Sequence, residues 1–354
     1  MKRVLLLTPG FQGADGISAH SRLCIDALSL PDVELTVASL ADYERRHDFP
    51  ATGVRAFFAG GSKHRFATFV LRQAFHRPDI VLCTHLALAQ TALPLTLLGS
   101  KLVVVLHGVE AWKPLRRLEM AAIKRAKLLI AVSRHTVGRF HVANPKAAGV
   151  RIEVCHNALP DTSPPPRAAA LNGPPFALIV ARMSSEERYK GHDLLLEIWN
   201  EVRAKASAAR LVVAGDGDDR KRLEAKRDAL GMQDSVEFLG RVPDEQLQSL
   251  YRDCAFFVMP SSGEGFGLVF LEAIRAGKAC IGAVGSASEI IVHSETGFVF
   301  DADDRSSIRD ACIRLFNDPE LAARLGENGR RREAEVFDKE SFGKRLRELV
   351  LEKA

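Results

Sequence analysis

Short apolar runs recur along the chain and alternate with segments in which apolar residues return every three or four positions. The runs predict buried parallel strands, and the segments between them predict helices with one apolar face. Because strands and helices alternate, the pattern predicts an α/β fold of doubly wound parallel sheets, which bind ligands at the carboxyl ends of their strands. The expected strands are residues 4–8, 34–40, 79–83, 101–106, 127–132, 176–181, 211–214, 236–239, 255–259 and 279–283.

Two segments rich in proline interrupt this alternation near the middle of the chain. Residues 160–167 read Pro-Asp-Thr-Ser-Pro-Pro-Pro-Arg, and residues 172–175 read Asn-Gly-Pro-Pro. Such composition is typical of linkers. At 354 residues the chain is long enough for two ordinary domains. We therefore expect a domain on each side of the linker, with a cleft between them.

The composition fits a globular protein, because 47% of the residues are hydrophobic and 26% are charged. No apolar run approaches the roughly 20 residues that span a bilayer, and the first run is too short for a signal peptide. The six cysteines stand at no metal-ligand or redox spacing. This favours buried thiols in a reducing cytosol, so we expect a cytoplasmic protein.

Positive charge is concentrated in the first half of the chain. Residues 1–160 hold 21 Lys and Arg against 11 Asp and Glu, and the remainder holds 28 against 33. Residues 63–77 and 113–127 mix basic with apolar side chains, which is a pattern that can lie on an anionic membrane. Alternatively, the apolar side chains face the sheet and the charges face water. The phenylalanines concerned are Phe66, Phe69 and Phe75.

The most informative chemistry lies in a glycine-rich loop that follows the expected strand at residues 255–259. Three alternate glycines surround the carboxylate of Glu264, and a helical pattern begins at Leu268. A glycine-rich loop that enters a helix presents free N–H groups and the positive end of the helix dipole, so it can cradle phosphate. Glu272 lies about one and a half turns into the helix, so that the two carboxylates can border one ligand.

The sequence Glu264-Gly-Phe-Gly, followed by Glu272 and by Ala-Gly-Lys-Ala at residues 276–279, resembles the motif of retaining GT-B glycosyltransferases of the family 4 type. The resemblance spans nearly the whole chain and is more specific in the second half. It implies two Rossmann-like domains that face a cleft. The acceptor-binding domain is expected at residues 1–163, the nucleotide-sugar-binding domain at 174–337, and a C-terminal helix that crosses back to the first domain at 338–354.

The resemblance also implies which residues act in catalysis. Arg182 directly follows the first strand of the second domain, and Lys190 opens the next helix. Such a pair can hold a departing diphosphate, although Arg188 is an alternative to Arg182. Glu264 is expected to orient the sugar hydroxyls. His107 follows a strand and is expected near the transferred sugar, with a histidine packed at a sheet edge as the alternative.

The loop after the first strand has a glycine at every third position. This spacing differs from Gly-x-Gly-x-x-Gly and disfavours a nicotinamide site. The family usually carries a Gly-Gly pair here, where this chain has Asp15-Gly16. The loop is either a backbone contact to donor and acceptor or a plain turn into a helix over residues 18–30 that is capped by Ser18. The donor-binding residues implied by the resemblance are Gly13, Gly16, Gly215, Val242, Gly265, Phe266, Gly267, Leu268, Val269 and Glu272.

Two Asp-x-Asp sequences are similar to the metal-binding motif of the other major transferase fold. They lie at residues 216–218 and 301–303, and we interpret their aspartates as helix caps. Arg182 and Lys190 already supply the positive charge that a metal ion would bring. We therefore expect neither a metal ion nor another cofactor.

Together these features predict a retaining transfer of a hexosyl group, of the mannose or glucose type, from a UDP-sugar or GDP-sugar. The expected acceptor is a hydroxyl of a lipid-linked saccharide in cell-envelope polysaccharide or glycolipid assembly. A transferase with a small soluble acceptor, a sugar-nucleotide epimerase and a binding module for nucleotide sugars are the alternatives. No nucleic-acid partner is expected, and attachment to the inner face of the membrane would go through the first domain.

Overall fold

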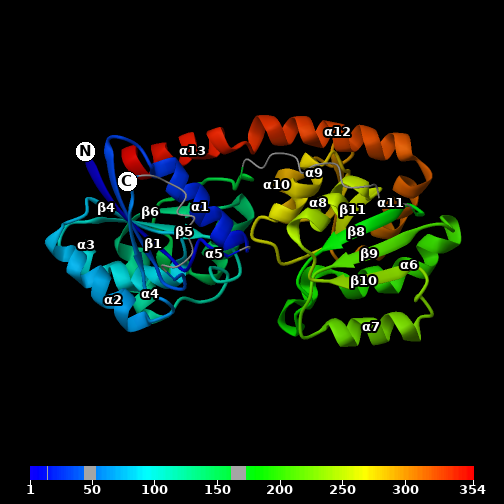
Figure 1. Cartoon of the computed structure of the whole chain (residues 1–354), viewed down its shortest axis with the longest axis horizontal. Helices are drawn as coiled ribbons and strands as arrows, with labels where there is room; N and C mark the ends of the chain where they lie inside the picture. The colour runs from blue at the N-terminus through cyan, green and yellow to red at the C-terminus, as the bar shows by residue number, and fades with distance from the viewer. Residues whose placement is uncertain (14, 44–52, 161–172) are drawn as a thin grey trace. The chain divides into compact units, whose positions relative to one another are not determined.

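The computed structural model describes residues 1–13, 15–43, 53–160 and 173–354. Residues 1–160 and 337–354 form one compact unit, and residues 161–336 form the other. Each unit contains a parallel sheet with helices packed on it (Figure 1), which confirms the expected doubly wound α/β fold. The proline-rich linker predicted at residues 160–167 lies, apart from its first residue, outside the described residues.

The first unit is built on a seven-stranded sheet with the order β3-β2-β1-β4-β5-β6-β7. All neighbouring strands in it are parallel. The sequence predicted the five inner strands and missed β3 and β7, because these edge strands are short and only partly buried. The strands are β1 (Lys2–Thr8), β2 (Val33–Ser39), β3 (Arg55–Phe58), β4 (Ile80–Cys83), β5 (Lys101–Leu106), β6 (Ala126–Ala131) and β7 (Ile152–Val154).

Helices cover both faces of this sheet, and α1 lies beside α13 (Figure 1). The expected cap of the first helix was wrong. The helix begins at Gly16, and the carboxylate of Asp15 accepts hydrogen bonds of 3.0 Å from the N–H groups of Ile17 and Ser18. The helices are α1 (Gly16–Leu28), α2 (Lys63–Arg72), η1 (Gln73–Phe75), η2 (Leu86–Ala92), α3 (Leu93–Leu97), α4 (Arg117–Arg125), α5 (Arg134–Ala143), η3 (Pro145–Ala147), α13 (Lys339–Arg347) and η5 (Glu348–Glu352).

The last residues of the chain pack onto the first unit through an apolar face. Phe342, Leu346, Leu349 and Val350 are buried, as their helical spacing predicted. Ion pairs hold the edges of this segment: Arg345 contacts Glu153 at 2.9 Å, and Lys339 contacts Asp26 at 3.2 Å. The C-terminal segment is therefore an integral layer of the first unit.

The second unit is built on a six-stranded parallel sheet with the order β10-β9-β8-β11-β12-β13. The strands are β8 (Phe176–Val180), β9 (Arg210–Ala214), β10 (Val236–Gly240), β11 (Phe256–Met259), β12 (Cys280–Ala283) and β13 (Gly297–Phe300), of which the edge strand β13 was not predicted. The helices are η4 (Ser185–Lys190), α6 (His192–Lys205), α7 (Arg220–Ala229), α8 (Asp244–Asp253), α9 (Leu268–Arg275), α10 (Ala287–Ile290), α11 (Arg305–Asn317) and α12 (Pro319–Val336).

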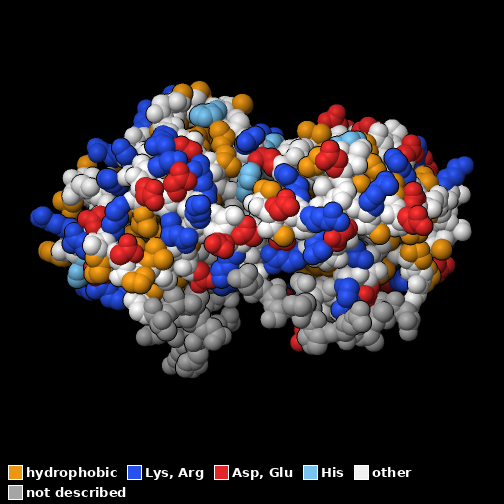
Figure 2. All heavy atoms as spheres, turned by 90° about the horizontal axis from the view of Figure 1, so that it is seen from above, with side chains coloured by type: hydrophobic (Ala, Val, Ile, Leu, Met, Phe, Trp, Pro, Cys, Tyr) orange, Lys and Arg blue, Asp and Glu red, His pale blue; other side chains and the backbone are white. Residues whose placement is uncertain are grey.

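The cysteines, the apolar character of the helices and the surface charge agree with a globular α/β protein. All six cysteines are free and buried in the two cores. Among the described helices, none is both long and apolar enough to cross a bilayer. In the view of Figure 2, basic and acidic side chains are interspersed on the visible surface of each unit.

Gly215 allows two strand ends of the second sheet to approach closely. It follows β9 with a φ of +131°, and its N–H group donates to the carbonyl oxygen of Gly240 at 2.8 Å. A Cβ atom at this position would lie 2.0 Å from the carbonyl oxygen of Ala181, which follows β8. Only glycine fits both the backbone conformation and the space.

We expect Gly215→Ala to lower the free energy of unfolding of the second unit by about 3 kcal/mol or more, because a strained φ adds to a backbone collision. Gly231→Ala is the matched control, since Gly231 has a φ of +67° but no atom within 4 Å of an added Cβ. It should cost only about 1 kcal/mol. Urea unfolding, followed by Trp199 fluorescence in a Trp112→Phe background, measures the free energy of unfolding of both variants. Equal losses in the two variants would contradict the close approach of the backbone at Gly215.

Candidate functional site

Two serine hydroxyls, one within the loop and one at the start of α10, hold the glycine-rich loop between β11 and α9. The hydroxyl of Ser261 donates to Oε1 of Glu264 at 3.0 Å, and the hydroxyl of Ser286 donates to the carbonyl oxygen of Glu264 at 2.8 Å. Gly267 adopts a φ of +96° immediately before α9. The first N–H groups of that helix, at Leu268 and Val269, have no intrahelical acceptor. The loop therefore combines an anchored carboxylate with a helix N-terminus.

Lys190 and Glu264, both predicted site residues, contact each other directly. The ammonium of Lys190 lies 2.5 Å from Oε1 of Glu264, although the two residues are 74 positions apart. The side chains are only 17% and 13% exposed, so this ion pair is largely desolvated. Lys190 is the last residue of η4, and Gly191 follows it with a φ of +92° as the N-cap of α6. The structure thus places a cation beside the predicted phosphate cradle.

The two candidate arginines have different surroundings. Arg182 follows β8, and its Nε atom donates to Glu187 at 3.0 Å while the side chain stays 67% exposed. Arg188 is bound instead by Asp219, at 3.0 and 3.2 Å, and the Asp219 side chain is only 6% exposed. Arg182 is therefore the guanidinium more open to a ligand.

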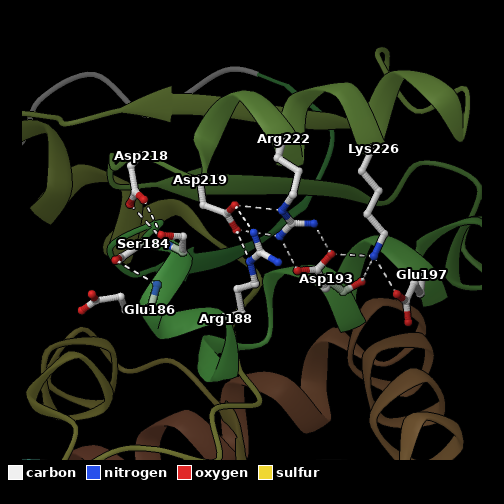
Figure 3. Close-up of polar contacts among 10 residues, drawn as sticks. Ser184, Glu186, Arg188, Asp193, Glu197, Asp218, Asp219, Arg222 and Lys226 are labelled. Carbon is white, nitrogen blue, oxygen red and sulfur yellow. Dashed lines mark hydrogen bonds and ion pairs between the residues drawn. The ribbon is translucent and has the colours of Figure 1, made fainter.

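Asp219 belongs to a chain of ion pairs that connects η4, α6 and α7 (Figure 3). Asp219 also binds Arg222, which binds Asp193 at 2.6 and 2.8 Å. Lys226 continues the chain, with contacts of 2.6 Å to Asp193 and Glu197. Hydrogen bonds from Arg222 and Lys226 lower the pKa of Asp193 below its usual value. Arg188 is thus the terminal member of a structural network.

Glu272 lies on α9 and was predicted to accept hydrogen bonds from a ligand. The hydroxyl of Tyr251 on α8 donates to Oε2 of Glu272 at 2.7 Å. Burial raises the pKa of the Glu272 carboxyl. Sequence reasoning missed Tyr251, because a tyrosine on the apolar face of a helix gives no sign of its hydrogen-bond partner.

The remaining predicted residues of the second unit lie at the carboxyl ends of neighbouring strands. Gly215 follows β9, and Val242 lies in the short turn between β10 and α8. Gly265 and Phe266 lie in the loop that contains Glu264, and Phe266 is buried. The parallel order of the strands brings these positions to one edge of the sheet.

His107 lies at the corresponding edge of the first sheet, directly after β5. Its ring Nε2 atom lies 2.7 Å from the carbonyl oxygen of Thr84, so Nε2 carries the proton and donates. Its backbone N–H group donates to Glu110 at 2.6 Å. Burial lowers the pKa of His107, with neighbouring Glu110 acting against this shift. His107 is therefore a fixed and neutral imidazole near neutral pH.

A buried polar layer lies beside His107 and was not predicted. The His20 ring meets the His107 ring edge-on with centroids 4.7 Å apart, and His20 Nδ1 lies 2.7 Å from Oδ1 of Asn157. The hydroxyls of Thr8, Ser21 and Thr84 form a chain with distances of 2.8 and 3.1 Å. The polar residues on the apolar face of α1 were the available signal, because such groups require buried partners.

The glycine-rich loop after β1 lies at the same sheet edge as His107. Gly16 is the first residue of α1, and the guanidinium of Arg22 donates to the carbonyl oxygen of Gly13 at 2.7 Å. The N–H group of Phe11 donates to Asp42 at 2.8 Å. The loop is thus held in place from within the first unit.

The aspartates of the two Asp-x-Asp sequences do not cap helices as predicted. Asp218 accepts a hydrogen bond of 3.1 Å from the N–H group of Ser185, and the N-cap positions of α7 and α11 belong to Asp219 and Asp304. In the described parts of the chain, no group of three or more His, Cys, Asp or Glu side chains could hold a metal ion.

Two family descriptions match the chain and together span most of it. "Glycosyltransferase Family 4" matches residues 14–163, and "Glycosyl transferases group 1" matches residues 166–332. The chain belongs to the GT-B glycosyltransferases of the family 4 type. This agrees with the resemblance inferred from the loop around Glu264.

Similar proteins include several glycosyltransferases. The GDP-mannose-dependent alpha-(1-6)-phosphatidylinositol monomannoside mannosyltransferase of Mycolicibacterium smegmatis is 29% identical over 73% of this chain and 74% of its own length. The lipopolysaccharide core biosynthesis mannosyltransferase LpcC of Rhizobium leguminosarum is 34% identical over 47% of this chain, and the alignment spans half of that relative.

Solved structures of the same GT-B fold cover nearly the whole chain. Sucrose-phosphate synthase of Thermosynechococcus elongatus has a TM-score of 0.80 at 20% identity and covers 99% of this chain and 98% of its own. The Anabaena protein HepE in complex with UDP has a TM-score of 0.76 at 20% identity and covers 99% of this chain and all of its own.

The buried histidine of this glycosyltransferase predicts a loss of stability in acid. Burial lowers the pKa of His20 to about 3, whereas an unfolded histidine titrates near 6.5. The unfolded chain therefore binds a proton below pH 6.5 that the folded chain does not bind until about pH 3. Stability should be full above pH 6.5 and should fall by about 2 kcal/mol at pH 5 from His20 alone.

Trp112 fluorescence in a Trp199→Phe background can follow unfolding of the first unit at pH 7.5 and pH 5. The drop in unfolding temperature between the two pH values should be smaller in His20→Gln than in the parent. The exposed His64 provides the control, because His64→Gln should leave the drop unchanged. If His20→Gln shows the same drop in unfolding temperature as the parent, His20 is not a source of the acid sensitivity.

Proposed function

We propose that the chain is a retaining glycosyltransferase that moves a hexosyl group of the mannose or glucose type from a UDP-sugar or GDP-sugar. The proposed acceptor is a hydroxyl of a lipid-linked saccharide in cell-envelope polysaccharide or glycolipid assembly. The observation that carries the proposal is the desolvated ion pair of Lys190 and Glu264 beside the loop that enters α9. Two mannosyltransferases among the relatives, one acting on a phosphatidylinositol mannoside, support a hexosyl donor and a lipid-linked acceptor.

The proposed chemistry places growing negative charge on the departing diphosphate. Arg182, Lys190 and the N–H groups at residues 265–269 would stabilise that charge, and preorganised groups of this kind lower the barrier most. On the same-face route the donor phosphate takes the acceptor proton, so no protein nucleophile is needed. His107 would bind the sugar, and its fixed neutral ring suits a hydrogen bond better than a charge.

The ion pair between Lys190 and Glu264 would be exchanged when the donor binds. A diphosphate carries more negative charge than one carboxylate and can accept from Lys190 in place of Glu264. Glu264 would then be free to accept hydrogen bonds from the sugar hydroxyls, which are neutral donors. Because protein cations serve the diphosphate, we propose that transfer requires no divalent metal ion.

Release of nucleoside diphosphate from UDP-glucose, GDP-mannose and related donors, with and without acceptor and a chelator, tests the proposal. Lys190→Ala and Arg182→Ala should each lower turnover about a hundredfold or more, because each removes a contact to the leaving group. Lys221→Ala, at an exposed position on α7, is the matched control and should remain active.

The pair of arginines gives the test a second outcome. Near-normal turnover in Arg182→Ala, with a collapse in Arg188→Ala at unchanged unfolding temperature, would transfer the diphosphate contact to Arg188. Activity that is lost with chelator and restored by magnesium would contradict metal-independent transfer. Donor turnover that yields an isomerised nucleotide sugar without acceptor would indicate an epimerase.

Part of the first unit has the character of a membrane-facing surface. Phe66 is buried and Phe69 stacks on Phe57 at 4.0 Å, so these two side chains belong to the core and cannot insert into lipid. Phe75 is 89% exposed. The helices α2, η1, α3 and α4 form the basic-apolar surface, whose exposed apolar residues are Leu71, Phe75, Leu97, Leu98 and Leu118 and whose exposed basic residues are Lys63, Arg65, Arg72, Arg77, Arg116, Arg117, Lys124 and Arg125.

We expect the protein to bind vesicles that contain phosphatidylglycerol at low salt and to be released at high salt, because each basic residue near the surface contributes about 1 kcal/mol and salt screens it. Changing Lys63, Arg65, Arg116 and Arg117 together to Ser should abolish most binding, and Phe75→Ser should weaken it. The control removes four exposed charges of the second unit, Lys221, Arg241, Arg324 and Arg331. Equal losses in both quadruple variants, or no binding by the parent at low salt, would refute the membrane contact.

A further inference from the structure

Tyr251 occupies an unusual position for a polar side chain. It lies in the second half of α8 and is fully buried, with its ring centroid 5.9 Å from that of Phe257 on β11. A buried hydroxyl without a hydrogen-bond partner costs free energy, so the Tyr251 hydroxyl needs an acceptor within the protein. The acceptor is Oε2 of Glu272 on α9, at 2.7 Å.

This hydrogen bond engages one oxygen of the carboxylate and leaves the other available. Within the described parts of the chain, Oε1 of Glu272 receives no hydrogen bond from the protein. An ionised carboxylate can accept several hydrogen bonds and binds vicinal hydroxyls well. Glu272 is therefore held at one atom and able to bind a ligand with the other.

Helix α8 links this carboxylate to the turn that contains Val242. The helix begins at Asp244, directly after the Val242-Pro243 turn, and it packs against α9. Through Tyr251, α8 therefore contacts Glu272 of α9, which was predicted to bind the donor. A single helix connects the two places where a nucleoside would be recognised.

We infer that Tyr251 is a positioning residue for the ribose of the nucleotide, acting through Glu272, which it holds in place to accept the ribose hydroxyls. The inference rests on the proposed function, because it assumes that the second unit binds a nucleoside diphosphate. Tyr251 itself does not contact the ligand. Its effect should therefore depend on both the Glu272 carboxylate and the ribose hydroxyls.

The test is calorimetric titration of the full-length protein with UDP and GDP. Tyr251→Phe keeps the ring and removes only the hydroxyl, and it should weaken binding of the preferred nucleoside diphosphate about tenfold. Turnover at saturating donor should change little, so that KM rises and kcat is preserved. Tyr43→Phe, at an exposed tyrosine of the first unit, is the matched control and should bind normally.

Two further comparisons separate positioning from a general structural role. The 2′,3′-dideoxy form of the preferred diphosphate should bind equally to the parent and to Tyr251→Phe, because it lacks the hydroxyls that Glu272 would accept. In a Glu272→Gln background, Tyr251→Phe should cause little additional loss. A variant that loses the same factor for the dideoxy ligand, or that loses tenfold again in the Glu272→Gln background, would overturn the inference.

The outcomes also separate this inference from the proposed function. If the parent binds neither UDP nor GDP, the proposed function fails and the inference fails with it. If the parent binds one of them and Tyr251→Phe binds it equally well, only the inference fails. Unfolding temperatures of the variants distinguish loss of binding from loss of fold.

Discussion

Each of the three basic side chains between β8 and α6 of the second unit is paired with a carboxylate, and these ion pairs determine how accessible each positive charge is. Lys190 pairs with Glu264, Arg182 with Glu187 and Arg188 with Asp219. The pairs differ in exposure, since Lys190 is largely desolvated and Arg182 is mostly in water. Exposed pairs are weak and buried ones are costly to break. The exposed pair of Arg182 therefore costs little to open, whereas opening the desolvated pair of Lys190 needs a replacement anion such as the proposed diphosphate.

Both sheets carry polar groups at the carboxyl ends of their strands, but the residue types differ between the two units. In the second unit a helix N-terminus, a lysine and two carboxylates gather at the carboxyl ends of the strands. In the first unit the corresponding edge holds a neutral imidazole, His107, which is fixed by Thr84 and by the layer around His20. A neutral edge suits uncharged sugar or acceptor hydroxyls, whereas a cationic edge suits a diphosphate. The chemistry of each unit thus follows from which polar groups the strand ends present.

The sequence predicted most of this fold because the inner strands are continuous apolar runs, whereas β3, β7 and β13 are short edge strands without that pattern. Lys190 and Glu264 were predicted as site residues from a recognisable loop and its flanking strands, but the ion pair between them was not predicted. The hydrogen-bond partners of Tyr251, His20 and Thr84 could not be predicted, since these partners lie 21 to 137 positions away and only tertiary packing brings them together. Phe66 and Phe75 look alike in sequence, but Phe66 on α2 is buried and Phe75 at the end of η1 is exposed, and only the packed structure distinguishes them.

Because all six cysteines are buried, the surface presents no thiol that reacts readily with a labelling reagent. Burial raises the pKa of every one of these thiols, so almost none is present as the nucleophilic thiolate at neutral pH. A cysteine introduced at an exposed position, such as that of Lys63 on α2, would react with a maleimide dye far faster than any native thiol. An environment-sensitive fluorophore could thus be attached at one chosen point, and its emission would report directly on whether that point meets lipid.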